Sequence, residues 1–184
     1  TAAEEIIIYS NANHFLRNLD TGEHITKLTN LKRLTIGAYG LTSLHPDFKN
    51  LKNLEYLDLS SNCFQTIPDI LTQENFPNLH ALVLNANQRH TIYDLSNDIR
   101  ENVGGFIDEP KFPERILKWN KLDTIRLSVN YLQGELPKML DHEKWTAEEV
   151  QANDTLPDVL IGLPKVLPDT EFFAINYNRL TGEI

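Results

Sequence analysis

Apolar residues in this 184-residue chain follow two alternating spacings, three or four residues apart and then two residues apart. In the stretch LKNLEYLDLSSNCFQTIP, residues 51–68, leucines stand at 51, 54, 57 and 59. The wider spacing favours a turn or short helix, and the alternation after it favours a strand whose side chains point to opposite faces. The pattern therefore predicts short strands, each joined to a turn or helical segment.

The frame L-x-x-L-x-L-x-x-N-x-L recurs along the chain. Its clear copies begin at Leu54, Leu79, Leu122 and Thr170. A copy from Leu31 has Tyr39 in place of the asparagine. A weaker first copy gives Ile8, Asn13 and Phe15, and a register with Ile6, Ile8 and Asn11 also fits. Large apolar residues stand three positions before each first slot, at Leu28, Leu51, Phe76, Trp119 and Leu167.

These motifs resemble the leucine-rich repeat family. The resemblance implies an α/β solenoid, a right-handed coil with a parallel β-sheet on the concave face and short helices or 3₁₀ turns on the convex face. We expect a single domain over residues 1–184, made of about six repeats. One unit cannot bury its apolar face alone, but a stack of units can.

The repeated asparagines have a structural interpretation. A carboxamide carries both donors and acceptors, so at a bend it can bond the backbone of its own coil and of the next. We predict a ladder of such side chains, at Asn13, Asn62, Asn87, Asn130 and Asn178. Tyr39 interrupts that ladder, and we expect its coil to be looser.

The spacing of the asparagine positions predicts two insertions, near residues 90–112 and 141–163. Gly104-Gly105 indicates a turn in the first. In the second, Thr146 and Glu149 form a capping box, which predicts a short helix from about Ala147. Insertions in repeat proteins are often functional, although covering the convex side is the simpler interpretation.

The motifs LQGELP and LTGEI, with the insertions, resemble cell-surface leucine-rich repeat proteins of gut Bacteroidetes. That resemblance implies a surface or secreted protein whose lipid-anchored leader has been removed. No capping unit follows Ile184, so we expect the chain to be truncated at its C-terminal end.

Composition excludes several partners and gives little sign of catalysis. A formal net charge of -9 argues against nucleic acid, and no apolar run is long enough for a membrane span. The six histidines show no metal-binding spacing, and the one cysteine, Cys63, has no activating base near it in sequence. We therefore expect no cofactor, no metal and no enzymatic activity.

The residues between the apolar slots should line the concave face. Aromatic residues and arginines there are candidate ligand-binding residues, because both are enriched at binding hot spots. Together with Asp58 they form two groups, the first Arg33, Tyr56 and Asp58 and the second Arg126, Phe172 and Tyr177. Exposed aromatic residues can also serve only to stabilise cross-strand pairs.

These observations favour a non-catalytic recognition module whose concave face holds a protein, peptide or glycan. The alternative is an accessory scaffold subunit of a larger cell-surface assembly, such as a nutrient-uptake complex. A third hypothesis, a hydrolase site built by the insertions, would use Asp94, Asp98, His90 and His142.

Overall fold

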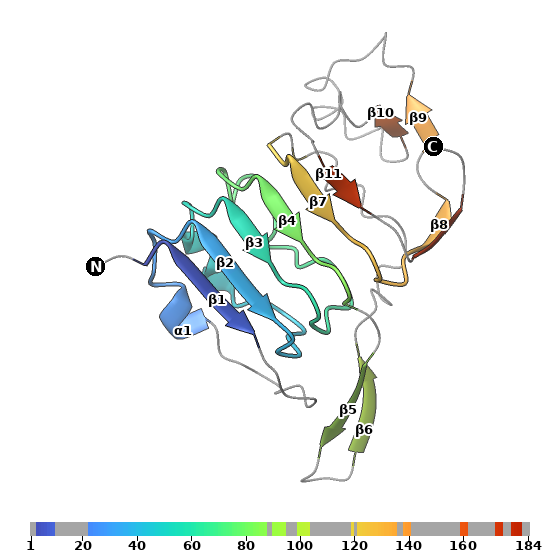
Figure 1. Ribbon diagram of the computed structural model, residues 1–184, viewed down its shortest axis with the longest axis horizontal. Helices are drawn as coiled ribbons and strands as arrows, with labels where there is room; N and C mark the ends of the chain where they lie inside the picture. The colour runs from blue at the N-terminus through green and yellow to red at the C-terminus, as the bar shows by residue number, and fades with distance from the viewer. Residues whose placement is uncertain are drawn as a thin grey trace.

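A six-stranded sheet forms one wall of the computed structural model, and all neighbouring strands in it are parallel (Figure 1). Its strands in spatial order are β1 (Glu5–Tyr9), β2 (Arg33–Gly37), β3 (Tyr56–Asp58), β4 (Ala81–Val83), β7 (Thr124–Arg126) and β11 (Phe172–Ala174). The structure describes residues 3–9, 22–87, 90–94, 99–103, 119, 121–135, 138–140, 159–161, 172–174 and 178–181.

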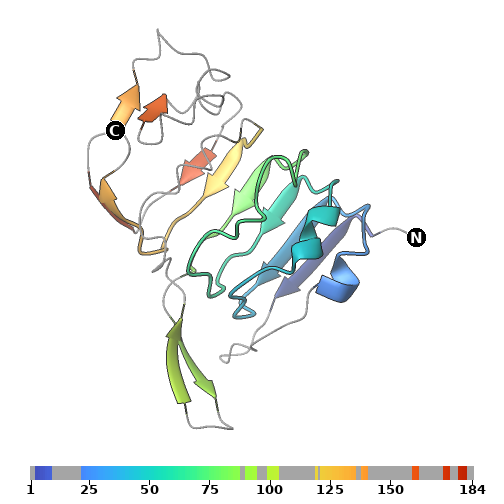
Figure 2. The same cartoon turned by 180° about the vertical axis from the view of Figure 1, so that it is seen from behind.

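The remaining elements lie outside this sheet. Helix α1 (Gly22–Ile25) and the 3₁₀ helix η1 (Pro46–Asn50) lie behind it, on the face opposite the viewer of Figure 1 (Figure 2). The other described strands form three separate two-stranded sheets. They are the antiparallel hairpin of β5 (His90–Asp94) and β6 (Ile99–Val103), the parallel pair β8 (Gln133–Glu135) and β12 (Arg179–Thr181), and the parallel pair β9 (Lys138–Leu140) and β10 (Val159–Ile161).

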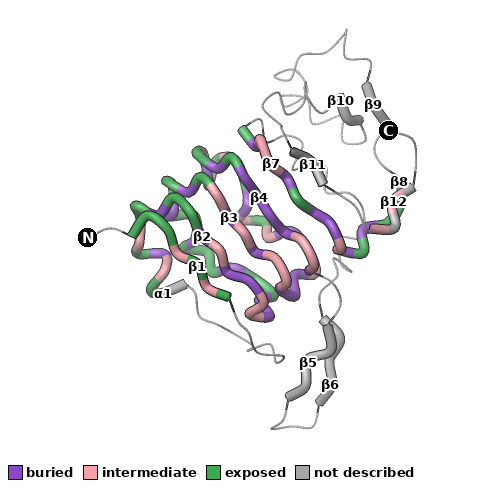
Figure 3. The backbone as a smooth tube through the Cα atoms, in the orientation of Figure 1, coloured by how far each residue is buried: buried purple, intermediate pink, exposed green. Residues whose placement is uncertain are grey.

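The core is built from apolar residues that stack in register. The central row across the sheet is Ile6, Leu34, Leu57, Leu82, Ile125 and Phe173. Leu34, Leu57, Leu82 and Ile125 are fully buried, and so are the residues two positions later, Ile36, Leu59, Leu84 and Leu127. Figure 3 shows buried segments in the coils of β2, β3, β4 and β7. The predicted solenoid-like repeat with a parallel sheet is therefore confirmed.

The repeated asparagines join successive coils. Asn62 is fully buried, and its Oδ1 accepts hydrogen bonds from the backbone N–H groups of Tyr39 and Leu41, at 3.1 and 3.2 Å. Its Nδ2 donates to the carbonyl oxygens of Ile36 and Leu59, at 2.7 and 2.9 Å. One side chain thus satisfies backbone groups of two coils, which would otherwise be unpaired in the core.

The same arrangement continues toward the C-terminal coils. Asn87 Nδ2 donates to Leu84 O at 2.9 Å, and Asn130 Nδ2 donates to Leu127 O at 2.8 Å. The backbone N–H of Asn87 donates to Asn130 Oδ1, and that of Asn130 donates to Asn178 Oδ1. The coil of Tyr39 has no asparagine of its own at this position. Its Ile36 carbonyl oxygen nevertheless accepts a hydrogen bond from Nδ2 of Asn62 in the next coil.

A second ladder, not predicted from the sequence, runs along the edge where the strands begin. Asn53 Nδ2 donates to the carbonyl oxygen of Thr29 at 2.8 Å, and Asn78 Nδ2 donates to that of Lys52 at 3.0 Å. In the next coil, Lys121 Nζ reaches Pro77 O at 3.0 Å. The signal in the sequence is an asparagine directly before the first leucine of successive frames.

The four coils that are described at this turn pass through a left-handed residue just before the asparagine position. The φ angles are 59° at Ala38, 59° at Ser61, 55° at Ala86 and 62° at Val129. Only glycine adopts this conformation without strain, and a β-branched residue such as valine is least suited to it.

Replacing Val129 with glycine is therefore expected to stabilise the protein. Relief of the left-handed strain outweighs the extra freedom of glycine in the unfolded chain, which leaves a gain of about 0.5–1 kcal/mol in unfolding free energy. Urea unfolding measures it, with Ala86→Gly as the matched control, where the gain should be smaller. A loss of stability in Val129→Gly would contradict this interpretation.

Both predicted insertions contain strands. The first includes the β5–β6 hairpin, in which Asp94 pairs with Ile99. A strand-like run on each side of Ser96-Asn97-Asp98 was the available signal. The turn expected at Gly104-Gly105 and the helix expected from Ala147 lie outside the described residues.

Candidate functional site

Two rows of residues lie between the buried slots of the sheet, and on β1, β2, β3, β4 and β7 their side chains point outward. The first row in register is Glu5, Arg33, Tyr56, Ala81, Thr124 and Phe172. The second row is Ile7, Thr35, Asp58, Val83, Arg126 and Ala174. These two rows, with Tyr9 at the end of β1, are called the outer face below.

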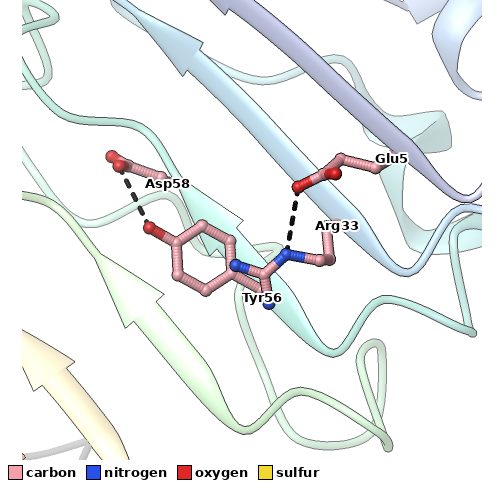
Figure 4. A network of polar contacts seen from close by, with 4 residues as sticks. All are labelled: Glu5, Arg33, Tyr56 and Asp58. Atoms are coloured by element: carbon pink, nitrogen blue, oxygen red, sulfur yellow. Dashed lines mark hydrogen bonds and ion pairs between the residues drawn. The ribbon is translucent and has the colours of Figure 1, made fainter.

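The structure brings Arg33, Tyr56 and Asp58 together and adds Glu5 to them (Figure 4). Arg33 Nε donates to Glu5 Oε1 at 3.1 Å, and its guanidinium carbon lies 4.3 Å from the centroid of the Tyr56 ring. The Tyr56 hydroxyl donates to Asp58 Oδ2 at 3.3 Å, which is long for such a bond. Asp58 Oδ1 accepts from the backbone N–H of Ser60 at 2.9 Å. Four side chains on three strands thus form one connected network.

The electrostatics of this network keep Tyr56 protonated. Burial of the ring raises the pKa of the hydroxyl, and the negative charge and hydrogen bond of Asp58 raise it further. The positive charges of Arg33 and Arg126 act in the opposite direction. Tyr56 is therefore a hydrogen-bond donor throughout the physiological pH range. The ion pair of Arg33 with Glu5 adds little stability, because both side chains are exposed.

The outer face also carries exposed apolar area on β1. Ile7 is 67% exposed and Tyr9 is 57% exposed. The Tyr9 ring lies directly over Gly37, where a Cβ atom would come within 2.4 Å of the ring. Because Gly37 has no side chain, the Tyr9 ring can lie against the sheet at this position.

The pairing of β1 with β2 corrects the sequence-based placement of the first repeat. Ile6 pairs with Leu34 and Ile8 with Ile36, so Ile7 lies in the second outward row and Glu5 in the first. By this register Asn11, rather than Asn13, falls in the asparagine position. Both asparagines lie outside the described residues.

The second predicted group is only partly described. Arg126 is exposed on β7, and Phe172 lies on the neighbouring β11, opposite Thr124. The side chain of Phe172 is not described, and Tyr177 lies outside the described residues.

The outer face is also less open at β4 than the repeat pattern predicts. Ala81 and Val83 are 8% and 4% exposed, because they are small and stand between the longer side chains of β3 and β7.

Two hollows lie away from the network. One, of about 280 Å³, is at the edge where the strands begin and is lined by polar residues, among them Glu4, Lys32 and Glu55. The other, of about 410 Å³, lies between the turns that follow β2 and β3, and Leu44, Lys49 and Ile70 are among its lining residues.

The described residues contain no group of three or more potential metal ligands, and in this part of the chain no helix is long and apolar enough to cross a membrane. His90 and Asp94, proposed for a hydrolase site, lie on β5, where only the backbone is described. Asp98 and His142 lie outside the described residues.

Cys63 is fully buried, and burial raises the pKa of its thiol from 9.0 to about 11. An unfolded chain releases this proton near pH 9, whereas the folded chain keeps it, so stability falls as the pH rises through this window. Compared with Cys63→Ala, the wild-type protein should lose about 2 kcal/mol more stability between pH 8 and pH 10.5. Urea unfolding at both pH values measures this difference, and equal losses would contradict it.

Part of the chain matches a known protein family. Residues 29–88 match the family model described as leucine rich repeat. Among the solved structures that match is a leucine-rich repeat protein of Leptospira interrogans, with 18% identity and a TM-score of 0.38. That match covers 88% of this chain and 47% of the Leptospira chain, so this chain spans about half of its length. No curated protein sequence matches. Residues 29–88 are therefore leucine-rich repeats.

Proposed function

We propose that the leucine-rich repeats of this chain form a recognition module that binds a protein partner through the outer face. The observation that carries the proposal is the network of Glu5, Arg33, Tyr56 and Asp58 beside the exposed Ile7 and Tyr9. Tyrosine and arginine dominate binding hot spots, and here both are held in place before any partner arrives. Leucine-rich repeats commonly serve in protein binding, which supports the same conclusion.

Protein is favoured over glycan as the partner. A sugar is usually bound by stacking on the face of an aromatic ring, but the guanidinium of Arg33 already covers one face of Tyr56. The rest of the network offers charged groups with fixed directions, and such groups suit the mixed polar and apolar surface of a protein.

The proposal is tested by removing exposed side chains of the outer face that do not support the core. We expect the variant Ile7→Ser/Tyr9→Ser/Arg126→Gln to lose at least about tenfold in capture of its partner from cell extracts, since hot-spot truncations each cost more than 1 kcal/mol. The matched control, Thr42→Ala/Lys49→Ala/Thr66→Ala, changes three exposed residues around the 410 Å³ hollow. Equal capture by both variants would contradict the proposal.

A further inference from the structure

Arg33 is held in a fixed orientation but uses only part of its hydrogen-bonding capacity. Its Nε is engaged by Glu5 and the face of its guanidinium by Tyr56. Among the described residues, its two terminal nitrogens form no hydrogen bond or ion pair, and 53% of its side chain is exposed. A guanidinium has five N–H donors, and the edge formed by its terminal nitrogens matches the two oxygens of a carboxylate.

The acidic groups around Arg33 do not compete for that edge. Glu5 binds the Nε side, and Asp58 is engaged by the Tyr56 hydroxyl and the Ser60 N–H. Glu5 and Asp58 carry two negative charges against the one of Arg33, so the network offers a carboxylate no net positive charge. What it offers is the set of N–H donors on the terminal nitrogens of Arg33, which are already held in a fixed orientation.

The surroundings of the site are apolar on one side. Glu5 pairs with Arg33 and Ile7 with Thr35, so the exposed Ile7 stands diagonally next to Arg33 on the neighbouring strand. Tyr9 follows two residues further along β1. An acidic group that reaches Arg33 can thus be accompanied by an apolar group resting on Ile7 and Tyr9.

We propose that Arg33 receives the carboxylate of an Asp or Glu side chain of the partner, bound end-on by its two terminal nitrogens, with a neighbouring apolar side chain on Ile7 and Tyr9. This inference rests on the proposed function and specifies its ligand. A side chain presented from the surface of a partner suits this site, because about half of the Arg33 side chain is exposed.

The probe is the blocked dipeptide N-acetyl-Glu-Leu-amide, titrated into the isotope-labelled protein while NMR follows the Arg33 side chain and the amides of β1 to β3. N-acetyl-Gln-Leu-amide is the neutral control, and N-acetyl-Gln-Leu with a free terminal carboxylate tests a chain end. We expect the Glu dipeptide to bind at millimolar concentration and to shift the Arg33 signals, and the Gln amide to shift them far less.

Two substitutions form a matched pair. Arg33→Gln and Lys32→Gln each remove one positive charge and one exposed ion pair, with Glu5 and Glu4 respectively. Arg33→Gln should weaken binding of the Glu dipeptide about three- to tenfold, whereas Lys32→Gln should change it less than twofold. Arg33→Lys keeps the positive charge but loses the two terminal nitrogens that can bind both carboxylate oxygens at once. It should therefore weaken binding of the Glu dipeptide about as much as Arg33→Gln does. Glu5→Gln keeps an acceptor for Nε, removes a repelling charge and should strengthen binding.

Several outcomes would overturn the inference. They are equal effects of Arg33→Gln and Lys32→Gln, equal binding of the Glu and Gln amides, or tighter binding of the peptide with a free terminus. Capture of a partner that depends on Ile7, Tyr9 and Arg126 but not on Arg33 would also overturn it, while leaving the proposed function intact.

Discussion

Replacing Asn62 with alanine is expected to lower the free energy of unfolding by about 4 kcal/mol, because several buried backbone groups lose their partners at once. The side chain is fully buried and bonds the N–H groups of Tyr39 and Leu41 and the carbonyls of Ile36 and Leu59. Each buried group left without a partner costs about 1–3 kcal/mol, and entry of water into the new space recovers part of that cost.

The control for this variant is Asn53→Ala in the edge ladder. Asn53 makes one bond, to the carbonyl of Thr29, and it is exposed, so water can replace the amide. Its removal should cost no more than about 1 kcal/mol. Urea unfolding followed by circular dichroism measures both variants. Similar losses for Asn62→Ala and Asn53→Ala would show that the buried ladder does not hold the coils together.

Replacing Phe48 with alanine is expected to cost about 3–5 kcal/mol, the range found for large aromatic residues removed from a core. Phe48 is the buried residue of η1, and its side chain is fully covered. Helix η1 lies behind the sheet (Figure 2), and Phe48 belongs to one apolar cluster with the leucines of the coils. Its loss therefore opens a cavity on the side of the solenoid away from the outer face.

Lys49, the next residue of the same 3₁₀ helix, provides the control. It is exposed, and its replacement with alanine should change stability by less than about 0.5 kcal/mol. Thermal unfolding of both variants gives the comparison. If Phe48→Ala unfolded within about 1 °C of the wild-type protein, Phe48 would not belong to the core, since 1 kcal/mol shifts the midpoint by several degrees at this size.

The sequence predicted the inner side of the coils well. Leu57, Leu82 and Leu127 are fully buried as expected, because a strand between two paired neighbours has only two faces and the apolar residues fill one of them. The position of Asn62 followed from the same frame. The leucine slots repeat from coil to coil, and the asparagine repeats in all the clear copies of the frame, so each copy supports the others.

The outer face was less predictable because its contacts are not repeated. Arg33, Tyr56 and Asp58 could be placed on one face from the frame, but the participation of Glu5 depends on the register of β1. That register remained ambiguous in the sequence because Ile6, Ile7 and Ile8 are all apolar. The exposure of Val83 could not be derived either, since it depends on the length of the side chains on both neighbouring strands.

The central claim is that a partner binds the outer face, and site-specific photo-crosslinking tests it most directly. A photoreactive amino acid is placed at Thr35, between Ile7 and Asp58 on the outer face, or at Asp47 on η1, behind the sheet. The protein is then irradiated in extracts of its source cells, and adducts are identified by mass spectrometry. We expect one partner to be crosslinked from Thr35 and not from Asp47. The same adduct from both positions, or from Asp47 alone, would contradict the claim.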